Sequence, residues 1–308
     1  MTARLLMSDS ISNSGSDSGP VPVRADIGPL IDSYDGVILD LWGVVHDGRT
    51  PYPGAKSALA QMMAAGKKVV MLSNAPRRAQ AVIEGMTAMG LGRALYSDVL
   101  SSGELTWAAL KRRDDAWLKG LGSRCLHLGP DRDLGLMDGL DLEVVAAPEA
   151  GAFILNTGPW RDEETLADYQ DLLARAAGLA MPMICANPDM EVIRAGNRII
   201  CAGTLAAHYQ TLGGSVRSFG KPYPETYDAC LTLMGLADKS RLIAIGDSFA
   251  TDIAGANAAG VDAVLVTSGI HGAELGLAYG EVPDGARLSA VCRAKGLRLK
   301  AAVPTLAW

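Results

Sequence analysis

The sequence predicts an α/β protein whose core is a doubly wound parallel sheet and which carries a second, inserted α/β domain. Short apolar strands alternate with amphipathic helices from Asp35 onward, which is typical of a parallel sheet covered on both faces. Residues 103–215 then separate one half of this pattern from the other. A segment of that length is too long for one crossover, so we expect it to fold as a domain of its own.

The elements of the core follow one another in a regular order. The expected strands are residues 37–41, 68–72, 242–245 and 261–266. The helices expected between them are residues 55–65, 77–89, 225–234 and 252–259. Each helix has a proline or glycine near the end where that residue is favoured. Open sheets of this kind bind ligands at the carboxyl ends of their strands.

The inserted domain and the N-terminus complete the predicted organisation. Within residues 103–215 we expect strands at 124–128, 152–155 and 182–185 and a helix at 163–177. Residues 8–20 are polar and of low complexity, without an apolar segment or a basic start. This composition predicts a disordered leader, residues 1–24, rather than a signal peptide. The core then comprises residues 25–102 and 216–308.

Composition narrows the class of partner. The chain has 308 residues, 49% of them hydrophobic, and a net charge of −6, which argues against a nucleic-acid or acidic-membrane surface. Its five cysteines are odd in number and form no Cys-x-x-Cys pair, as expected in a reducing compartment. No uninterrupted apolar segment approaches membrane-spanning length. We therefore expect a cytoplasmic protein.

The segment 38–48, Ile-Leu-Asp-Leu-Trp-Gly-Val-Val-His-Asp-Gly, is the first candidate site. It ends an apolar strand on Asp40 and then turns through glycines. A carboxylate at this strand end lies at the mouth of an open α/β sheet. Taken alone, an Asp-x-x-Gly sequence is better read as an Asx-turn or a helix cap.

Three further motifs follow in order. Residues 69–74 form a strand that ends in Ser73 and Asn74, and Gly-Lys-Pro at 220–222 precedes a helix start. Residues 242–252 form a strand that ends in Gly246-Asp247, with Asp252 five positions later. Together the four motifs resemble those of the haloacid dehalogenase-like (HAD) superfamily of aspartate-nucleophile phosphohydrolases.

The inserted domain adds to this resemblance. Its position is similar to that of the cap in the class IIA branch, which includes para-nitrophenyl phosphatase-like, phosphoglycolate and pyridoxal phosphatases. Segments 153–158, 186–189 and 202–204 match that branch, and the resemblance spans residues 35–272. It implies an Mg²⁺-dependent phosphatase that acts on a small phosphorylated metabolite, such as a sugar phosphate.

The resemblance also assigns roles around the nucleophile. Asp40 would attack the phosphoryl group and form an aspartyl phosphate, which water then hydrolyses. Asp40, Asp247 and the backbone carbonyl of Trp42 would supply the hard oxygen ligands that Mg²⁺ prefers. Asp252 would not contact the metal directly but would hold Asp247 or a metal-bound water in place, and its alternative role is to cap the following helix.

Three residues are expected to hold the phosphate. The Ser73 hydroxyl and the backbone N–H of Asn74 would donate to phosphoryl oxygens, and the alternative role of Ser73 is to cap the helix after Pro76. Lys221 would bridge the phosphate and the Asp40 carboxylate.

Trp42 departs from the family pattern, in which a second aspartate at this position acts as the general acid and base. An indole cannot do either job. Three alternatives stay open: a weak phosphatase that favours good leaving groups, recruitment of another acid such as His46 or Asp47, and a phosphometabolite-binding pseudoenzyme. True haloacid dehalogenases also carry an aromatic residue here, but they need no Mg²⁺, and the acidic motif from Asp247 to Asp252 counts against them.

Substrate choice is assigned to the cap, with residues 187–194 as the candidate loop. Asn187 and Asp189 would hydrogen-bond a polar leaving group, and Arg194 would pair with a second anionic group. A simple turn at Asn-Pro-Asp is nearly as well supported. Caps of this branch often pair, which implies a homodimer through the cap.

Overall fold

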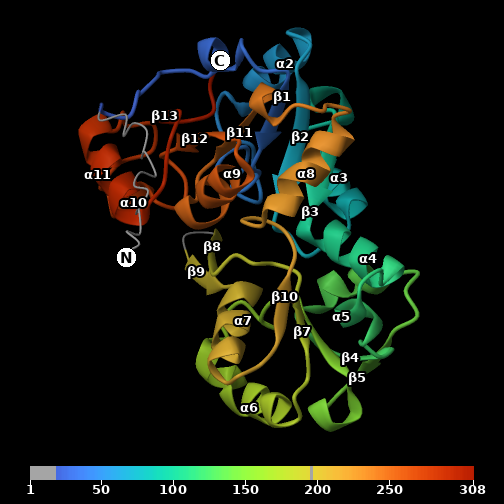
Figure 1. The fold of residues 1–308 in the computed structure, drawn as a ribbon. Helices are drawn as coiled ribbons and strands as arrows, with labels where there is room; N and C mark the ends of the chain where they lie inside the picture. Colours follow the sequence, from blue (N-terminus) through green and yellow to red (C-terminus); the bar gives the residue numbers. More distant parts are fainter. Residues whose placement is uncertain (1–18, 195–196) are drawn as a thin grey trace, which may run out of the picture.

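A computed structural model describes residues 19–194 and 197–308 and confirms the predicted α/β fold. Figure 1 shows two domains, with the core in the upper part of the view and the inserted domain below it. We call the inserted domain the cap. Within the described ranges, every helix is too short or too polar to cross a lipid bilayer.

The core contains a parallel six-stranded sheet with the order β13-β12-β11-β1-β2-β3. Its strands are β1 (Gly36–Leu39), β2 (Lys68–Ser73), β3 (Asp98–Ser101), β11 (Leu242–Gly246), β12 (Asp262–Val266) and β13 (Ala301–Val303). Leu39 on the central strand β1 is in register with Ile245 of β11 and with Met71 of β2. The residues that follow these three strands therefore emerge side by side at one edge of the sheet.

Helices cover both faces of this sheet. They are α1 (Gly28–Ile31), α2 (Ala55–Ala64), α3 (Ala79–Ala88), α8 (Pro224–Leu233), α9 (Ala254–Ala259), α10 (Gly272–Leu275) and α11 (Gly285–Lys295). Val37 and Leu39 pack with α2 and α3 in one apolar cluster, while Ile38 packs with α8, α9 and α11 in another. Alternate residues of a strand point to opposite faces, so this division confirms the doubly wound arrangement.

The cap has its own parallel sheet, with the order β10-β7-β6-β4-β5. Its strands are β4 (Arg124–Leu128), β5 (Glu143–Val145), β6 (Phe153–Asn156), β7 (Met183–Cys185) and β10 (Val216–Ser218). The helices α4 (Ser102–Arg112) and α5 (Ala116–Lys119) pack on one face, and α6 (Gln170–Gly178) and α7 (Ala202–Thr211) pack on the other. An antiparallel hairpin, β8 (Glu191–Arg194) and β9 (Asn197–Ile200), lies between the cap and the core in Figure 1.

Short helical turns complete the elements. The 3₁₀ turns are Arg93–Leu95, Asp131–Met137, Pro148–Ala150, Leu166–Tyr169 and Lys239–Arg241, and a π-turn spans Phe249–Ile253. The helix expected at 252–259 therefore begins as this π-turn, and the one expected at 163–177 begins as the 3₁₀ turn Leu166–Tyr169.

Two predicted boundaries differ from the structure. The cap was expected to end at residue 215, but β10 pairs with β7 and so extends the cap sheet to Ser218. The leader was expected to run to residue 24, and its residues 1–18 lie outside the described ranges. Residues 19–24 of the predicted leader are described, and two of them bond to distant parts of the core: the Val21 N–H donates to the Gly285 carbonyl and the Arg24 N–H to the Ala302 carbonyl. Composition cannot reveal such backbone pairing with a distant strand.

Candidate active site

Asp40 directly follows the central strand β1. Its backbone N–H donates to the Ile245 carbonyl at 2.9 Å, and one of its carboxylate oxygens, Oδ1, accepts a hydrogen bond from Lys221 Nζ. Burial raises the pKa of the Asp40 carboxyl to about 7; the Lys221 ammonium lowers it, and the Asp252 carboxylate raises it. The other oxygen, Oδ2, has no hydrogen-bond partner in the part of the chain that the structure describes.

Asp40, Asp247 and Asp252 each offer a carboxylate oxygen, and these atoms lie within 4.8 Å of one another. Burial raises the pKa of Asp247 well above its usual value, and the charges of Asp40 and Asp252 add to this effect. Such crowding of buried acids favours a bound cation that offsets their repulsion. Carboxylate oxygens are the ligands that Mg²⁺ prefers, so the donor set fits this metal.

The backbone around Asp247 is shaped to its carboxylate. Oδ2 of Asp247 accepts a hydrogen bond from the Ile270 N–H at 2.7 Å. A Cβ atom at Gly43 or at Gly269 would lie 1.9 Å or 2.1 Å from this same oxygen. Only glycine can occupy these two positions, and the carboxylate is held in one orientation as a result.

Asp252 lies inside the π-turn and not at a helix cap. Its Oδ1 accepts from Lys221 Nζ at 2.8 Å, and its Oδ2 accepts from the Ser248 N–H at 3.0 Å. The capping role falls to Ser248, whose hydroxyl accepts from the Thr251 N–H at 3.3 Å. The capping alternative for Asp252 is therefore wrong, and both of its oxygens are engaged in holding neighbouring groups.

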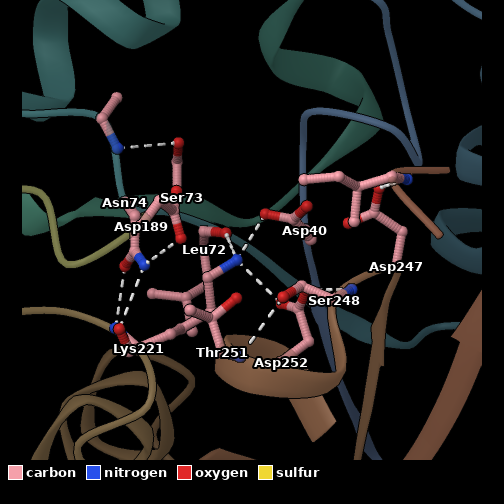
Figure 2. Close-up of polar contacts among 12 residues, drawn as sticks. Asp40, Leu72, Ser73, Asn74, Asp189, Lys221, Asp247, Ser248, Thr251 and Asp252 are labelled. Carbon is pink, nitrogen blue, oxygen red and sulfur yellow. Dashed lines mark hydrogen bonds and ion pairs between the residues drawn. The ribbon is translucent and has the colours of Figure 1, made fainter. Parts of the chain in front are cut away.

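Lys221 is buried and lies between the two acids that it joins (Figure 2). Its Nζ also donates to the Leu72 carbonyl at 3.3 Å. Burial by itself lowers the pKa of the Lys221 ammonium, but the charges of Asp252 and Asp40 outweigh this and hold the pKa well above its usual range. A permanently charged ammonium thus lies against the candidate nucleophile.

Ser73 and Asn74 end strand β2 beside this group. The Ser73 hydroxyl accepts from the Ala75 N–H at 3.2 Å, and the N–H of Ala79 at the start of α3 donates instead to Glu104 Oε2 at 3.0 Å. The alternative in which Ser73 caps α3 is therefore wrong. The Asn74 side chain donates to the Lys221 carbonyl at 3.0 Å and accepts from the Lys221 N–H at 2.8 Å.

The cap loop reaches the same place. Asn187 Oδ1 accepts from the Asp189 N–H at 3.1 Å, which is the Asx-turn that the Asn-Pro-Asp sequence favours. Asp189 Oδ1 accepts from Asn74 Nδ2 at 2.8 Å. Arg194 Nη1 pairs with both oxygens of Asp162, at 2.8 and 2.7 Å. The pairing of Arg194 with a substrate anion stays a prediction; in the structure its partner is Asp162, a cap carboxylate that it shares with Arg132.

Asp40 and the polar residues at the end of β2 and in the cap loop line one cavity of about 110 Å³, whereas Lys221, Asp247 and Asp252 lie outside its lining. The lining contains Asp40, Trp42, Ser73, Asn74, Asn187, Asp189 and Arg194. Charged residues that the sequence analysis missed also line it: Arg77, Arg132, Asp133 and Asp162. Arg77 stands three positions after Asn74 and could have been noticed, but nothing in the sequence indicates that residues 130–133 return to the site.

Trp42 occupies the position of the missing acid and faces this cavity. Its ring lies edge-on to His46, with the centroids 5.6 Å apart, and a Cβ at Gly48 would come within 2.1 Å of the indole. The His46 Nδ1 accepts from the Gly48 N–H at 3.0 Å, and burial lowers the pKa of His46 to about 4. Asp47 accepts from the N–H groups of Arg49 and Thr50. Both alternative acids are thus engaged within their own loop.

Known proteins resemble this chain in both sequence and structure. The family described as haloacid dehalogenase-like hydrolase matches residues 37–143, and the one described as HAD-hydrolase-like matches residues 218–287. A crystal structure of a hydrolase of the haloacid dehalogenase-like family from Brucella suis 1330 is 34% identical. It covers 92% of this chain and 100% of its own, with a TM-score of 0.78.

Two curated relatives extend this similarity. Chronophin of Homo sapiens is 28% identical over 268 residues, which cover 81% of this chain and 86% of the relative. Sugar-phosphatase AraL of Bacillus subtilis (strain 168) is 29% identical over 244 residues, which cover 76% of this chain and 83% of the relative.

Proposed function

Because this chain belongs to the haloacid dehalogenase-like hydrolase family and is a hydrolase of phosphoric monoesters, we propose that it is an Mg²⁺-dependent phosphatase of a small phosphorylated metabolite. The observation that carries the proposal is the convergence of Lys221 and Asp247 on Asp40, which lines a cavity together with residues of the cap. The small cavity volume of about 110 Å³ favours a small substrate. The similarity to a sugar-phosphatase supports a sugar phosphate as its class.

The side chains suggest how the reaction proceeds. Among the described residues, Asp40 Oδ2 has no hydrogen-bond partner, so it is the atom that attacks phosphorus while the bond to the leaving oxygen breaks. Lys221 holds the other oxygen of Asp40 and orients the attack. The Ser73 hydroxyl donates to a phosphoryl oxygen. Water then cleaves the aspartyl phosphate and regenerates Asp40.

Mg²⁺ would be held by Asp40 and Asp247, with the Trp42 carbonyl as a third ligand, and would neutralise charge on the phosphoryl group. Asp252 is assigned a positioning role, because both of its oxygens are hydrogen-bonded to Lys221 and to the Ser248 N–H. Its part in the metal site is to fix the geometry of its neighbours.

A phosphatase assay over a panel of phosphorylated metabolites, with and without Mg²⁺, tests this function. We expect phosphate release that requires Mg²⁺ and is lost in Asp40→Asn. Asp32→Asn is the matched control, because Asp32 is an exposed aspartate close to the same strand. Activity that survives Asp40→Asn would contradict the assignment of the nucleophile.

The presence of Trp42 in place of the usual acid favours a second candidate function, that of a pseudoenzyme that binds phosphometabolites without hydrolysing them. The indole lines the cavity in place of the acid that would protonate the leaving group. In that case isothermal calorimetry would detect binding of phosphometabolites with Mg²⁺, whereas no ester in the panel would release phosphate.

Compartment and assembly complete the proposal. The five cysteine thiols are free, which supports the cytoplasm as the compartment. A homodimer through the cap is supported by large apolar side chains that the cap exposes: Leu134, Val144, Trp160, Leu179, Met190, Ile193 and Leu212. Light scattering that detects only monomer at micromolar concentration would exclude the dimer.

A further inference from the structure

Arg77 is a cation that the proposed reaction does not yet use. It follows the phosphate-binding residues Ser73 and Asn74 in the loop before α3. Its carbonyl accepts a hydrogen bond from the Ser101 hydroxyl at 2.5 Å, and a Cβ at Gly103 would lie 2.4 Å from its backbone nitrogen. The Arg77 backbone is therefore fixed against the start of α4, and its side chain extends from a rigid base into the cavity lining.

The neighbouring arginines all have carboxylate partners. Arg78 makes a bidentate pair with Glu104 at 2.8 and 3.0 Å, and Arg132 and Arg194 share Asp162 at 3.6 and 2.7 Å. Within residues 19–194 and 197–308, the Arg77 guanidinium has neither an ion pair nor a hydrogen bond. It is the arginine of the cavity lining that is left for a ligand.

The surroundings of Arg77 make this lack of a partner costly. Burial lowers the pKa of its guanidinium; Asp133 opposes this effect, and Arg132 and Arg194 add to it. A half-buried cation without a hydrogen-bonded anion is less favourable than a paired one, and an anionic ligand would supply that partner. A guanidinium binds a carboxylate or a phosphate through two parallel N–H···O bonds, so the contact fixes the orientation of the anion and also offsets its charge.

Arg77 also connects two cavities. It lines the active-site cavity with Asp40, and together with Arg132 it lines a second cavity of about 320 Å³ beside α3. A substrate whose phosphoryl group lies at Asp40 thus has Arg77 within the same cavity and further space beyond it.

We propose that the leaving group of the substrate carries a second anionic group, a carboxylate or a phosphate, which binds to Arg77. This inference rests on the proposed phosphatase function and narrows its substrate to a phosphorylated acid or a bisphosphate. A sugar phosphate with no second anionic group would leave the guanidinium without a hydrogen-bonded anion.

Matched substrates test this directly. 3-Phosphoglycerate and glycerol 3-phosphate differ by a carboxylate in place of a hydroxymethyl group, and fructose 1,6-bisphosphate and fructose 6-phosphate differ by a second phosphate. We expect kcat/KM of the wild type to be at least about tenfold higher for the anionic member of one pair. The pair that shows the preference identifies carboxylate or phosphate. Equal values within both pairs would overturn the inference.

The variant Arg77→Gln links any preference to this side chain. It should lower kcat/KM for the preferred anionic ester about tenfold to a hundredfold, mainly through KM, and lower kcat/KM for para-nitrophenyl phosphate, which has no second anion, by a smaller factor. Arg77→Lys should recover part of the loss because it keeps the charge. Arg293→Gln, at an exposed position on α11, is the matched control. If folded Arg77→Gln still prefers the anionic member of the pair, another residue binds the second anion and the inference is overturned.

The failure of this inference can be told apart from failure of the phosphatase function. If the wild type hydrolyses para-nitrophenyl phosphate but does not discriminate within the pairs, the function stands and the second anion site is wrong. If no ester is hydrolysed, calorimetry with the same two pairs still decides: tighter binding of the anionic member supports the site, and equal binding excludes it.

Discussion

Asn74 of the core and Asp189 of the cap are joined by a hydrogen bond of 2.8 Å between Nδ2 and Oδ1. The same Asn74 amide bonds to both the N–H and the carbonyl of Lys221 (Figure 2). One side chain therefore ties the end of β2, the backbone of the buried lysine and the cap loop together. The position of the cap is coupled in this way to the residue that orients Asp40.

The link predicts different effects for two substitutions at Asp189. Asp189→Asn keeps an oxygen that can accept from Asn74, so it should retain most of kcat/KM. Asp189→Ala removes the acceptor and should lower kcat/KM about tenfold, since a lost buried hydrogen bond costs about 1–3 kcal/mol. Steady-state kinetics with para-nitrophenyl phosphate measures both. If Asp189→Asn is as impaired as Asp189→Ala, the charge matters, and Asp189 becomes the acid that position 42 lacks.

Mg²⁺ should stabilise the fold through the acidic cluster. At 100 times its dissociation constant the ion should add about 2.7 kcal/mol to the free energy of unfolding, seen as a rise in Tm that a chelator reverses. Asp247→Asn should abolish the rise, because Asp247 is one of the two proposed carboxylate ligands. Asp252→Asn should weaken it less, since both oxygens of Asp252 are already engaged. An equal rise in the wild type and Asp247→Asn would place the metal elsewhere.

Trp42 should limit turnover of esters with poor leaving groups. The wild type is expected to hydrolyse para-nitrophenyl phosphate, which needs little protonation, far better than alkyl phosphates. Trp42→Asp should raise kcat on alkyl phosphates selectively, towards the roughly hundredfold to ten-thousandfold that general acid catalysis supplies. The indole packs under Gly48 and against His46, so its loss also costs about 3–5 kcal/mol of stability. Denaturant unfolding must accompany the assay. Rapid turnover of an alkyl ester by the wild type would show that another group donates the proton.

Asp133 should make stability depend on pH. Burial raises the pKa of its carboxyl from 3.8 to about 6, although Arg132, Arg77 and Arg194 oppose this. The folded state then keeps a proton that the unfolded chain loses above pH 4, so the free energy of unfolding falls between pH 4 and 6 and levels off above. Asp133→Asn should remove this fall and be roughly 1–3 kcal/mol more stable than the wild type at pH 7. Lower stability of the variant at pH 7 would mean that attraction to the arginines outweighs the cost of burial.

The sequence by itself determined the core and the residues at its strand ends. Asp40, Ser73 and Asp247 each follow an apolar strand, and parallel strands in register bring such residues to one edge. Six strands of three or four residues were not predicted, namely β3, β5, β8, β9, β10 and β13. Strands this short show no periodicity, and these six lack the marked apolar run that identified β1, β6 and β7. The boundary error at residue 215 has the same origin, because β10 was one of the strands missed.

Only the tertiary structure decided which charged side chains line the cavity and which of them are paired. Arg194 was a reasonable choice from its loop, but Asp162 lies 32 positions away in the sequence and neutralises it, while Arg77 keeps no partner among the described residues. Likewise, nothing local indicates that Asp133 returns to the cavity or that Asp189 meets Asn74 across 115 positions. Periodicity reports the face that a residue presents within its own element, whereas these pairings depend on how the cap packs against the core.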